Sequence, residues 1–213
     1  ARGNIYKEDG EKLIEFVKNL DYKVELKLTS FQSILVRGIK KEDVLKLKEI
    51  MSEYYRGNEF YSSYSCIGST TCNVGILDTP PILDYIFEFF DNDEKRELTN
   101  YLPQIKVTGC PNSCATPQIA RLGFSGRRKK DGEYFAIYAR GEFSGKTVKL
   151  NENLGEIKAN KIPYFLEDIA NIIKNENIEF EKFANEDRFL GLIEDYKEIE
   201  VENVDFNEFR KID

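Results

Sequence analysis

The sequence predicts an α+β protein, and three observations lead to this prediction. Residues 1–56 alternate between helical and strand patterns, residues 57–150 are dense in Cys, Gly and Thr, and two helical patterns follow. Apolar residues that recur every three or four positions indicate helices, whereas apolar residues that alternate with polar ones indicate half-buried strands. We expect three segments, at residues 1–56, 57–175 and 176–213.

The first segment is expected to be a small alternating unit. A short strand is predicted at residues 5–6, followed by a helix that Asp9 can cap. Residues 24–28 alternate in polarity and predict a strand, and residues 34–37 predict a second one. A helical stripe over residues 41–55 completes the unit.

The later segments combine strands with buried helices. The middle segment predicts a strand entering Cys66, a buried helix at residues 81–90 and strands at residues 105–108, 122–125 and 133–143. A turn at Asp131-Gly132 joins the last two, directly after the basic run at residues 127–130. Helices led by Pro163 and from Asn185 are expected next, and residues 197–213 are charged and predict a surface tail.

Composition narrows the classes of function. The net charge of -7 and pI near 5.0 disfavour a nucleic-acid or anionic-membrane partner. No apolar run approaches the length of a bilayer span, and the first residues lack a signal-peptide pattern, so a cytoplasmic location is expected. The chain contains no His, which excludes His-ligated haem and His general-base catalysis and leaves Cys or carboxylates to bind any metal.

The four cysteines form two pairs, Cys66 with Cys72 and Cys110 with Cys114. Four is the number of thiolates that a cubane iron–sulfur cluster uses. Both loops contain Gly and small hydroxyl residues, so backbone N–H groups can approach the sulfurs. A structural zinc site and free or disulfide-bonded thiols remain alternatives, although zinc sites favour shorter spacings and disulfides favour secreted proteins.

Two segments around these cysteines resemble the signature of the nitrite and sulfite reductase family. They are Ser65-Cys66-Ile67-Gly68-Ser69-Thr70-Thr71-Cys72 and Thr108-Gly109-Cys110-Pro111-Asn112-Ser113-Cys114, the second running on to Gly123. Residues 24–37 also resemble the ferredoxin-like half-domain that precedes the cysteine domain in that family. The resemblance covers about residues 5–195 and implies a ferredoxin-like half-domain followed by an α+β domain with a mixed sheet and flanking helices.

The resemblance implies two cofactors, a [4Fe-4S] cluster and siroheme. It makes the four cysteines the cluster ligands, with Cys114 matching the thiolate that also bridges to the siroheme iron. It implies multi-electron reduction of a small oxyanion, nitrite to ammonia or sulfite to sulfide, with nitrite slightly favoured by the Cys110–Cys114 loop.

An anionic substrate and a carboxylate-rich tetrapyrrole require an electropositive site. The candidate catalytic cations are Lys106, Arg121, Arg127 and Arg128. The alternative interpretation of residues 127–130 is a solvated hairpin end. The resemblance further implies cofactor-binding roles for Cys114, Thr108, Asn112, Arg121 and Gln32.

The chain departs from the family pattern in its repeat number. Family enzymes usually hold siroheme between two repeats, whereas one repeat is present here, and Phe31 stands where the cluster-free repeat has a substrate-binding Arg. A second repeat, a partner subunit or a second copy is therefore expected to complete the siroheme pocket, and ferredoxin or a reductase subunit to donate electrons. The alternative is an iron–sulfur electron-transfer or binding module that has lost siroheme catalysis.

Overall fold

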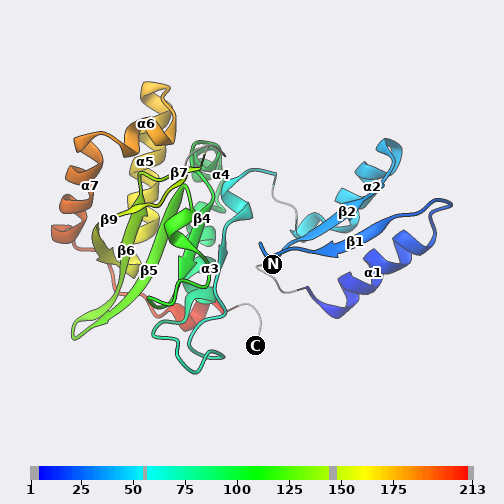
Figure 1. Cartoon of the computed structure of the whole chain (residues 1–213), viewed down its shortest axis with the longest axis horizontal. Coiled ribbons are helices and arrows are strands. Elements are labelled where there is room, and N and C mark those ends of the chain that lie inside the picture. The colour runs from blue at the N-terminus through cyan, green and yellow to red at the C-terminus, as the bar shows by residue number, and fades with distance from the viewer. Residues whose placement is uncertain (1–4, 55–56, 144–147, 211–213) are drawn as a thin grey trace. The chain divides into compact units, whose positions relative to one another are not determined.

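The chain divides into two compact units, Ala1–Gly57 and Asn58–Asp213 (Figure 1). The computed structural model describes residues 5–54, 57–143 and 148–210. Both units mix helices and strands, which confirms the α+β fold class. Residues 57–175 and 176–213, which the sequence suggested as separate segments, fall almost entirely within the second unit.

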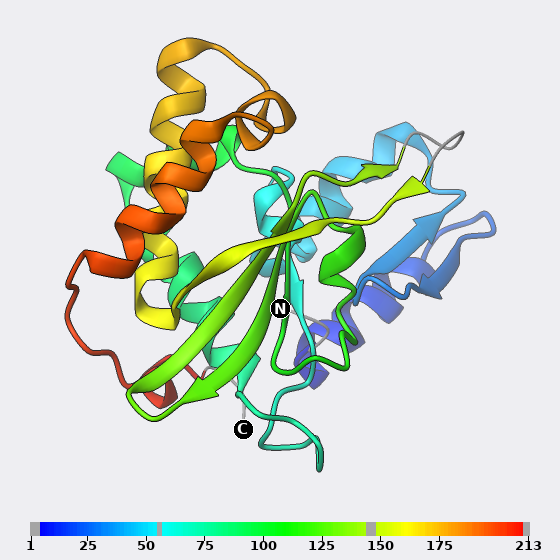
Figure 2. The same ribbon diagram turned by 60° about the vertical axis from the view of Figure 1, so that its left-hand side comes forward.

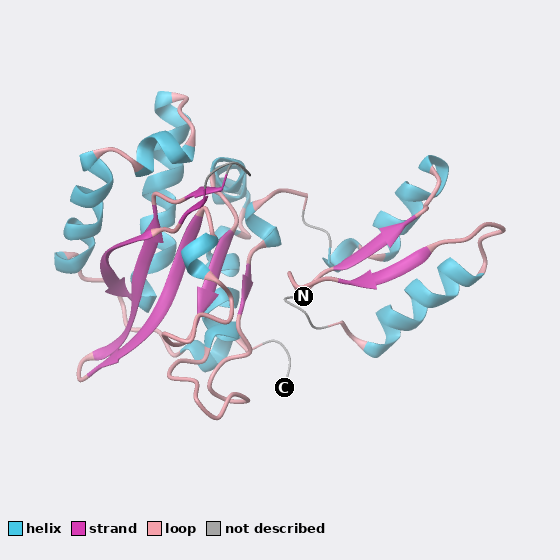
Figure 3. Ribbon diagram, in the orientation of Figure 1, coloured by secondary structure: helices cyan, strands magenta, loops and turns pink. Residues whose placement is uncertain are grey.

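The first unit contains a two-stranded antiparallel hairpin and two helices (Figure 3). Its elements are α1 (Lys7–Lys18), β1 (Glu25–Leu28), β2 (Ile34–Arg37) and α2 (Val44–Ile50). The hairpin register pairs Glu25 with Arg37 and Leu28 with Ile34. Leu13 and Phe16 form the buried stripe of α1, as their helical spacing predicts.

Three details of the first unit differ from the prediction. Residues 5–6 do not form a strand, because the Tyr6 amide donates to the Tyr54 hydroxyl at 3.0 Å and Tyr6 precedes α1 as its N-cap residue. Asp9 is not the cap and lies inside the first turn, where a carboxylate still favours the positive end of the helix dipole. The helix expected over residues 41–55 is interrupted, with 3-10 turns on both sides of α2, and residue 55 lies outside the described residues.

A five-stranded mixed sheet is the centre of the second unit. Its order is β3-β4-β5-β6-β9, with β3, β4 and β5 parallel and the last two strands antiparallel to their neighbours. The strands are β3 (Tyr64–Ser65), β4 (Ile105–Thr108), β5 (Leu122–Lys129), β6 (Gly132–Ala139) and β9 (Glu152–Lys158), and a separate pair is formed by β7 (Glu142–Phe143) and β8 (Val148–Lys149). The mixed sheet agrees with the prediction.

Helices gather on one side of this sheet (Figure 2). They are α3 (Thr79–Phe90), α4 (Asp93–Arg96), α5 (Ile162–Glu176), α6 (Phe180–Ala184) and α7 (Asp187–Glu198). Side chains of α3, α5 and α7 form one buried core with Ile105, Val107 and Phe124 of the sheet. Because successive side chains of a strand point to opposite faces, Lys106 and Thr108 of β4 lie on the sheet face away from these helices. None of the described helices is long and apolar enough to cross a membrane.

The described part of the C-terminal segment lies at the surface, as its charge suggested, but its end is anchored to the helix layer. A 3-10 turn at Phe206–Phe209 packs on α3, with the Phe206 and Phe209 rings 5.5 and 5.0 Å from the Tyr85 ring. Phe206 also contacts the main core. Two aromatic residues within an acidic stretch thus anchor the chain up to residue 210.

Candidate metal centre

The two cysteine loops leave the sheet at the same edge, because they follow neighbouring parallel strands. In the β3–β4 pair Ser65 lies opposite Val107, and the Cys66 amide donates to the Val107 carbonyl at 2.9 Å. Cys66 directly follows β3, and Cys110 follows β4 after one intervening residue. Since the carboxyl ends of parallel strands meet at one edge, the fold brings Cys66 next to the loop that contains Cys110.

Gly109 allows the two loops to touch. Its amide donates to Cys66 Sγ at 3.2 Å, and its carbonyl accepts from the Leu77 amide at 3.0 Å. A Cβ atom on this residue would lie 2.4 Å from the Leu77 carbonyl oxygen, which is too close for any other residue type without a backbone shift. The close contact therefore depends on glycine.

Thr79, the first residue of α3, approaches the same sulfur from another direction. It is fully buried, and its hydroxyl donates to the Cys66 carbonyl at 2.9 Å while lying 3.3 Å from Cys66 Sγ. Hydrogen bonds to a ligating sulfur stabilise its negative charge and tune the potential of an iron–sulfur cluster. The Cys66 sulfur thus accepts from the Gly109 amide and lies within hydrogen-bonding distance of the Thr79 hydroxyl, which suits a thiolate ligand.

Cys72 lies in a loop that folds back on itself. The Thr71 and Cys72 amides donate to the Gly68 carbonyl at 3.3 and 2.9 Å. Gly68 has a φ of +80°, in the left-handed region that favours glycine. The Ser69 amide donates to the Leu77 carbonyl at 3.1 Å and closes the base of the loop.

The second cysteine pair differs in exposure. Cys110 is buried with 6% of its surface accessible, whereas Cys114 is exposed. Ser113 and Thr116, on either side of Cys114, have positive φ values of 60° and 52°. Such conformations are uncommon for residues other than glycine and cluster at functional sites. The turn therefore presents Cys114 outward and keeps Cys110 inside.

All four cysteines are free thiols. Among the residues that the structure describes, no group of three or more Cys, Asp or Glu side chains is arranged to hold a single metal ion. A cubane cluster requires a wider arrangement of ligands than a single metal ion. Each thiolate binds its own iron atom, so the four cysteine sulfurs lie around the corners of the core. Four unbridged thiols on two adjoining loops, with amide and hydroxyl donors at Cys66, fit such a cluster.

Lys106 and Thr108 extend from the non-helical face of β4 next to the Cys110 loop. Lys106 is only 7% exposed, and its Nζ lies 5.7 Å from the centre of the Tyr64 ring. Thr108 is fully buried, and its hydroxyl donates to the Cys110 carbonyl at 3.5 Å. Thr108 thus contacts the Cys110 loop, Lys106 lies two residues before it on the same face of β4, and a catalytic role for Lys106 stays a prediction.

The two arginines of the basic run have different surroundings. Arg127 is half-buried, and its guanidinium donates to the Ser125 hydroxyl at 3.0 Å and the Gly126 carbonyl at 2.9 Å. The Ser125 hydroxyl in turn donates to the Cys110 carbonyl at 3.4 Å. Arg128 is exposed and pairs with Glu133 at 2.7 Å. Arg127 is thus connected to the Cys110 loop through one residue, whereas Arg128 also donates to the Ile76 carbonyl, in the segment after Cys72, at 3.4 Å.

Arg121 is held by two carboxylates. Its guanidinium forms a two-point ion pair with Glu181, one contact being 2.8 Å, and a further bond of 2.6 Å with Glu59. Burial acts to raise the pKa of Glu181, but hydrogen bonds from Arg121 and from its own backbone outweigh burial and lower it. In this structure Arg121 therefore joins the start of β5 to α6.

The remaining predicted residues lie in loops. Asn112 is exposed in the Cys110–Cys114 turn. Gln32 lies in the β1–β2 turn of the first unit, with a positive φ of 55°. A cofactor-binding role for either residue stays a prediction.

Sequence reasoning missed three residues around the first cysteine loop, namely Thr79, Asp78 and Arg210. The Asp78 carboxylate accepts from the Thr70 hydroxyl at 3.0 Å and from the Arg210 guanidinium. Asp78 and Thr79 could have been noticed as an Asx-Thr-Pro helix start directly after the loop. Arg210 carries no such local signal, because its contact depends on how the C-terminal segment packs.

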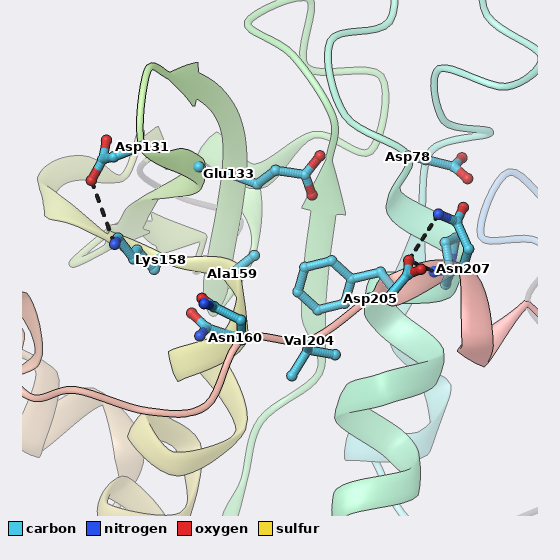
Figure 4. Close-up of a pocket in the computed structure, with 13 residues that line it drawn as sticks. Asp78, Asp131, Glu133, Lys158, Ala159, Asn160, Val204, Asp205 and Asn207 are labelled. Atoms are coloured by element: carbon cyan, nitrogen blue, oxygen red, sulfur yellow. Dashed lines mark hydrogen bonds and ion pairs between the residues drawn. The ribbon is translucent and has the colours of Figure 1, made fainter.

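Asp78 also lines a pocket of about 280 Å³ (Figure 4). The turn between β5 and β6, Lys158 of β9 and residues 203–207 line most of it. Asp78, Asp131, Glu133 and Asp205 give it four carboxylates against one lysine, and Lys158 lies 3.4 Å from Asp131. Two further carboxylates pair with arginines, Asp78 with Arg210 and Glu133 with Arg128.

Comparison with known proteins gives one family and a consistent set of relatives. Residues 56–196 match the model of the nitrite and sulphite reductase 4Fe-4S domain. The sulfite reductase [NADPH] hemoprotein beta-component of Afipia carboxidovorans is 28% identical over 72% of this chain, and that of Nitrobacter winogradskyi is 30% identical over 63%. The alignments cover 28% and 24% of those relatives, so the chain spans about a quarter of their length.

A solved structure shares the fold. The Mycobacterium tuberculosis NirA protein aligns with 78% of this chain at a TM-score of 0.59 and 19% identity, covering 33% of NirA. The family match spans well over half of the chain and contains all four cysteines. The chain therefore belongs to the nitrite and sulphite reductase 4Fe-4S domain family.

Proposed function

We propose that this chain is the cluster-bearing part of a siroheme-dependent reductase, in which Cys66, Cys72, Cys110 and Cys114 hold a [4Fe-4S] cluster. The observation that carries the proposal is the placement of Cys66 and Cys110 at the ends of two neighbouring parallel strands, with the Gly109 amide on the Cys66 sulfur. Membership in the 4Fe-4S domain family supports it.

The exposure of Cys114 supports a role in binding a second group. A ligand that the protein surrounds completely can serve only the cluster, whereas an exposed thiolate can also reach a cofactor outside. Siroheme would supply the redox chemistry by which a small oxyanion is reduced. Cys114 would link siroheme to the cluster, the exposed Asn112 would face the cofactor, and the buried Thr108 would support the Cys110 loop.

The nearby cations would bind the anionic groups. Lys106 and Arg127 are the better placed candidates, because both lie on the sheet face that adjoins the Cys110 loop. Burial strengthens their attraction for an anion, since the effective dielectric is lower than in water. Arg121 and Arg128 would have to exchange their present carboxylate partners to take part.

The substrate class is a small oxyanion, sulfite or nitrite. The Cys110–Cys114 loop slightly favoured nitrite, whereas the relatives described above carry the name of sulfite reductases. Because the chain spans about a quarter of those relatives, we propose that a second repeat, a subunit or a second copy completes the siroheme pocket. An external protein such as ferredoxin or a reductase subunit would deliver electrons.

Single Cys→Ser substitutions in the full chain test the cluster. After anaerobic loading, we expect about four iron and four sulfide per wild-type chain, because four thiolates hold one cubane. Cys66→Ser, Cys72→Ser and Cys110→Ser are each expected to lose most of their iron, whereas Val74→Ala, an exposed change in the same loop, should retain it. Equal iron in Cys66→Ser, Cys110→Ser and wild type would contradict the proposal.

Siroheme and turnover are measured on the same preparations. We expect red and near-ultraviolet bands of siroheme in the loaded protein with its completing partner, and turnover of sulfite or nitrite with a chemical reductant. Cys114→Ser should remain folded but lose the coupling between the two centres, so its turnover should fall. Iron and sulfide without siroheme uptake would instead support the alternative, an electron-transfer module.

A further inference from the structure

We propose that Arg210 is a positioning residue for the cluster, and that it fixes the Cys66–Cys72 loop through Asp78 and Thr70 so that Cys72 is presented to iron. This inference rests on the proposed function. Residue 210 lies outside the family match at residues 56–196, so the role belongs to a segment that the family comparison does not cover.

The first step is the weak anchoring of the Cys72 loop. Cys66 and Cys110 directly follow or nearly follow β3 and β4, which fix their positions. Cys72 instead lies in a turn, and its amide donates to the Gly68 carbonyl within the same loop. Thr70, Thr71 and residues 73–74 are exposed. Something other than the sheet must therefore hold the outer part of this loop.

The second step is the position of Asp78. It is the N-cap residue of α3, yet its carboxylate makes no capping bond to the helix. One carboxylate oxygen accepts from the Thr70 hydroxyl at 3.0 Å, and the other accepts from Arg210. Asp78 also packs on Gly68, where an added Cβ would lie 2.2 Å from its oxygen. A carboxylate that could stabilise the helix start is used to hold the loop instead.

The third step is the geometry of Arg210. Its guanidinium contacts both members of the loop pair, Asp78 through Nη2 and the Thr70 hydroxyl through Nη1 at 3.3 Å. The side chains of Arg210 and Asp78 are 24% and 18% exposed, so water screens this ion pair only in part. The Phe206 and Phe209 rings on Tyr85 hold the preceding turn in place. The three side chains thus form a closed clamp over the loop.

The experiment measures iron release from the anaerobically loaded full chain into a ferrous chelator. We expect Arg210→Met to release iron about 10-fold faster than wild type, in line with the usual effect of removing a residue that orients a metal ligand. Arg210→Lys keeps the charge and one contact, so its rate should lie between the two. Arg188→Met is the matched control, because Arg188 forms a comparable double ion pair, with Glu176 and Glu186. Its release rate should equal that of wild type.

A second measurement does not use the loaded protein. In the cluster-free chain, alkylation of Cys72 should be several-fold faster in Arg210→Met and in Thr70→Val than in wild type, while alkylation of Cys110 is unchanged. Thr70→Val removes a hydroxyl from the same clamp without changing the charge. This variant therefore tests the inference even if Arg210→Met folds poorly. Unchanged iron release and unchanged Cys72 alkylation would overturn the inference while leaving the cluster proposal intact. A wild-type chain that binds no cluster would overturn both.

Discussion

The Thr79 hydroxyl has two possible acceptors on one residue, the carbonyl oxygen of Cys66 at 2.9 Å and its sulfur at 3.3 Å. When the sulfur carries the negative charge of a thiolate, it becomes a stronger acceptor. The buried position of Thr79 excludes water as a competitor for this hydrogen bond.

We expect Thr79→Val to lower the reduction potential of the cluster, because the variant keeps the shape of the side chain but removes a hydrogen-bond donor to the Cys66 sulfur. Thr79→Ser retains the hydroxyl and should stay close to wild type. A redox titration of the cluster followed by electron paramagnetic resonance measures the shift. Equal potentials in the Val and Ser variants would show that the hydroxyl serves only the carbonyl.

The cysteines and their neighbours show what could be predicted from sequence at this scale. The four thiols and the two glycine-containing loops were identified from spacing and residue type. Thr79, Asp78 and Arg210 were not, because each acts through a contact made across the fold. The contacts of the basic run could not be predicted from the sequence either. Because β5 extends through residues 127 and 128, the two side chains point to opposite faces, so that Arg127 contacts Ser125 and Arg128 pairs with Glu133.

Among the elements, α6 is linked by an ion pair to the residue that precedes β5. Arg121 pairs with Glu181 of α6 and with Glu59, and the side chains of Arg121 and Glu181 are 35% and 51% exposed. Since the pKa of Glu181 is lowered, the pair stabilises the fold above the ordinary glutamate pKa of 4.5 and loses this contribution as pH falls below that value.

Arg121→Met is expected to reduce the free energy of unfolding by about 1 kcal/mol at pH 7, the upper range for a partly exposed ion pair. The difference between wild type and variant should shrink as the pH falls below 4.5, where Glu181 becomes protonated. Denaturant unfolding at neutral and acidic pH measures the difference in unfolding free energy between wild type and variant. Arg121→Lys is the control that keeps the charge. A difference that does not change with pH would argue against this pairing.

Strands and helices were predicted with uneven success, and the reasons are physical. Strong apolar patterns predicted α3, α5 and β4 with small errors at the ends. β9 was missed, because its strand contains three charged residues and a glycine in a seven-residue stretch. Its place beside β6 supplies the hydrogen bonds that its own composition does not suggest.

For the whole molecule, the division at Gly57 places every candidate cluster ligand in one unit. The contacts of Cys66 with Gly109 and Thr79, and of Asp78 with Arg210, also lie within Asn58–Asp213. The second unit has its own core of strands and helices. Its ability to hold a cluster should therefore not depend on the first unit.

We expect residues 58–213, produced alone, to unfold cooperatively and to bind as much iron and sulfide per chain as residues 1–213. Circular dichroism during denaturation and metal analysis after anaerobic loading test these two expectations. The full chain treated in parallel is the control. A folded fragment with little iron would show that the first unit contributes to the site.

The contrast between buried Cys110 and exposed Cys114 also affects how the protein must be handled. In a preparation that has lost its inorganic core, the accessible thiol meets oxygen and neighbouring molecules first. Exposure to air should then link chains in pairs through Cys114, and such covalent pairs on a non-reducing gel would record how much of the material is damaged.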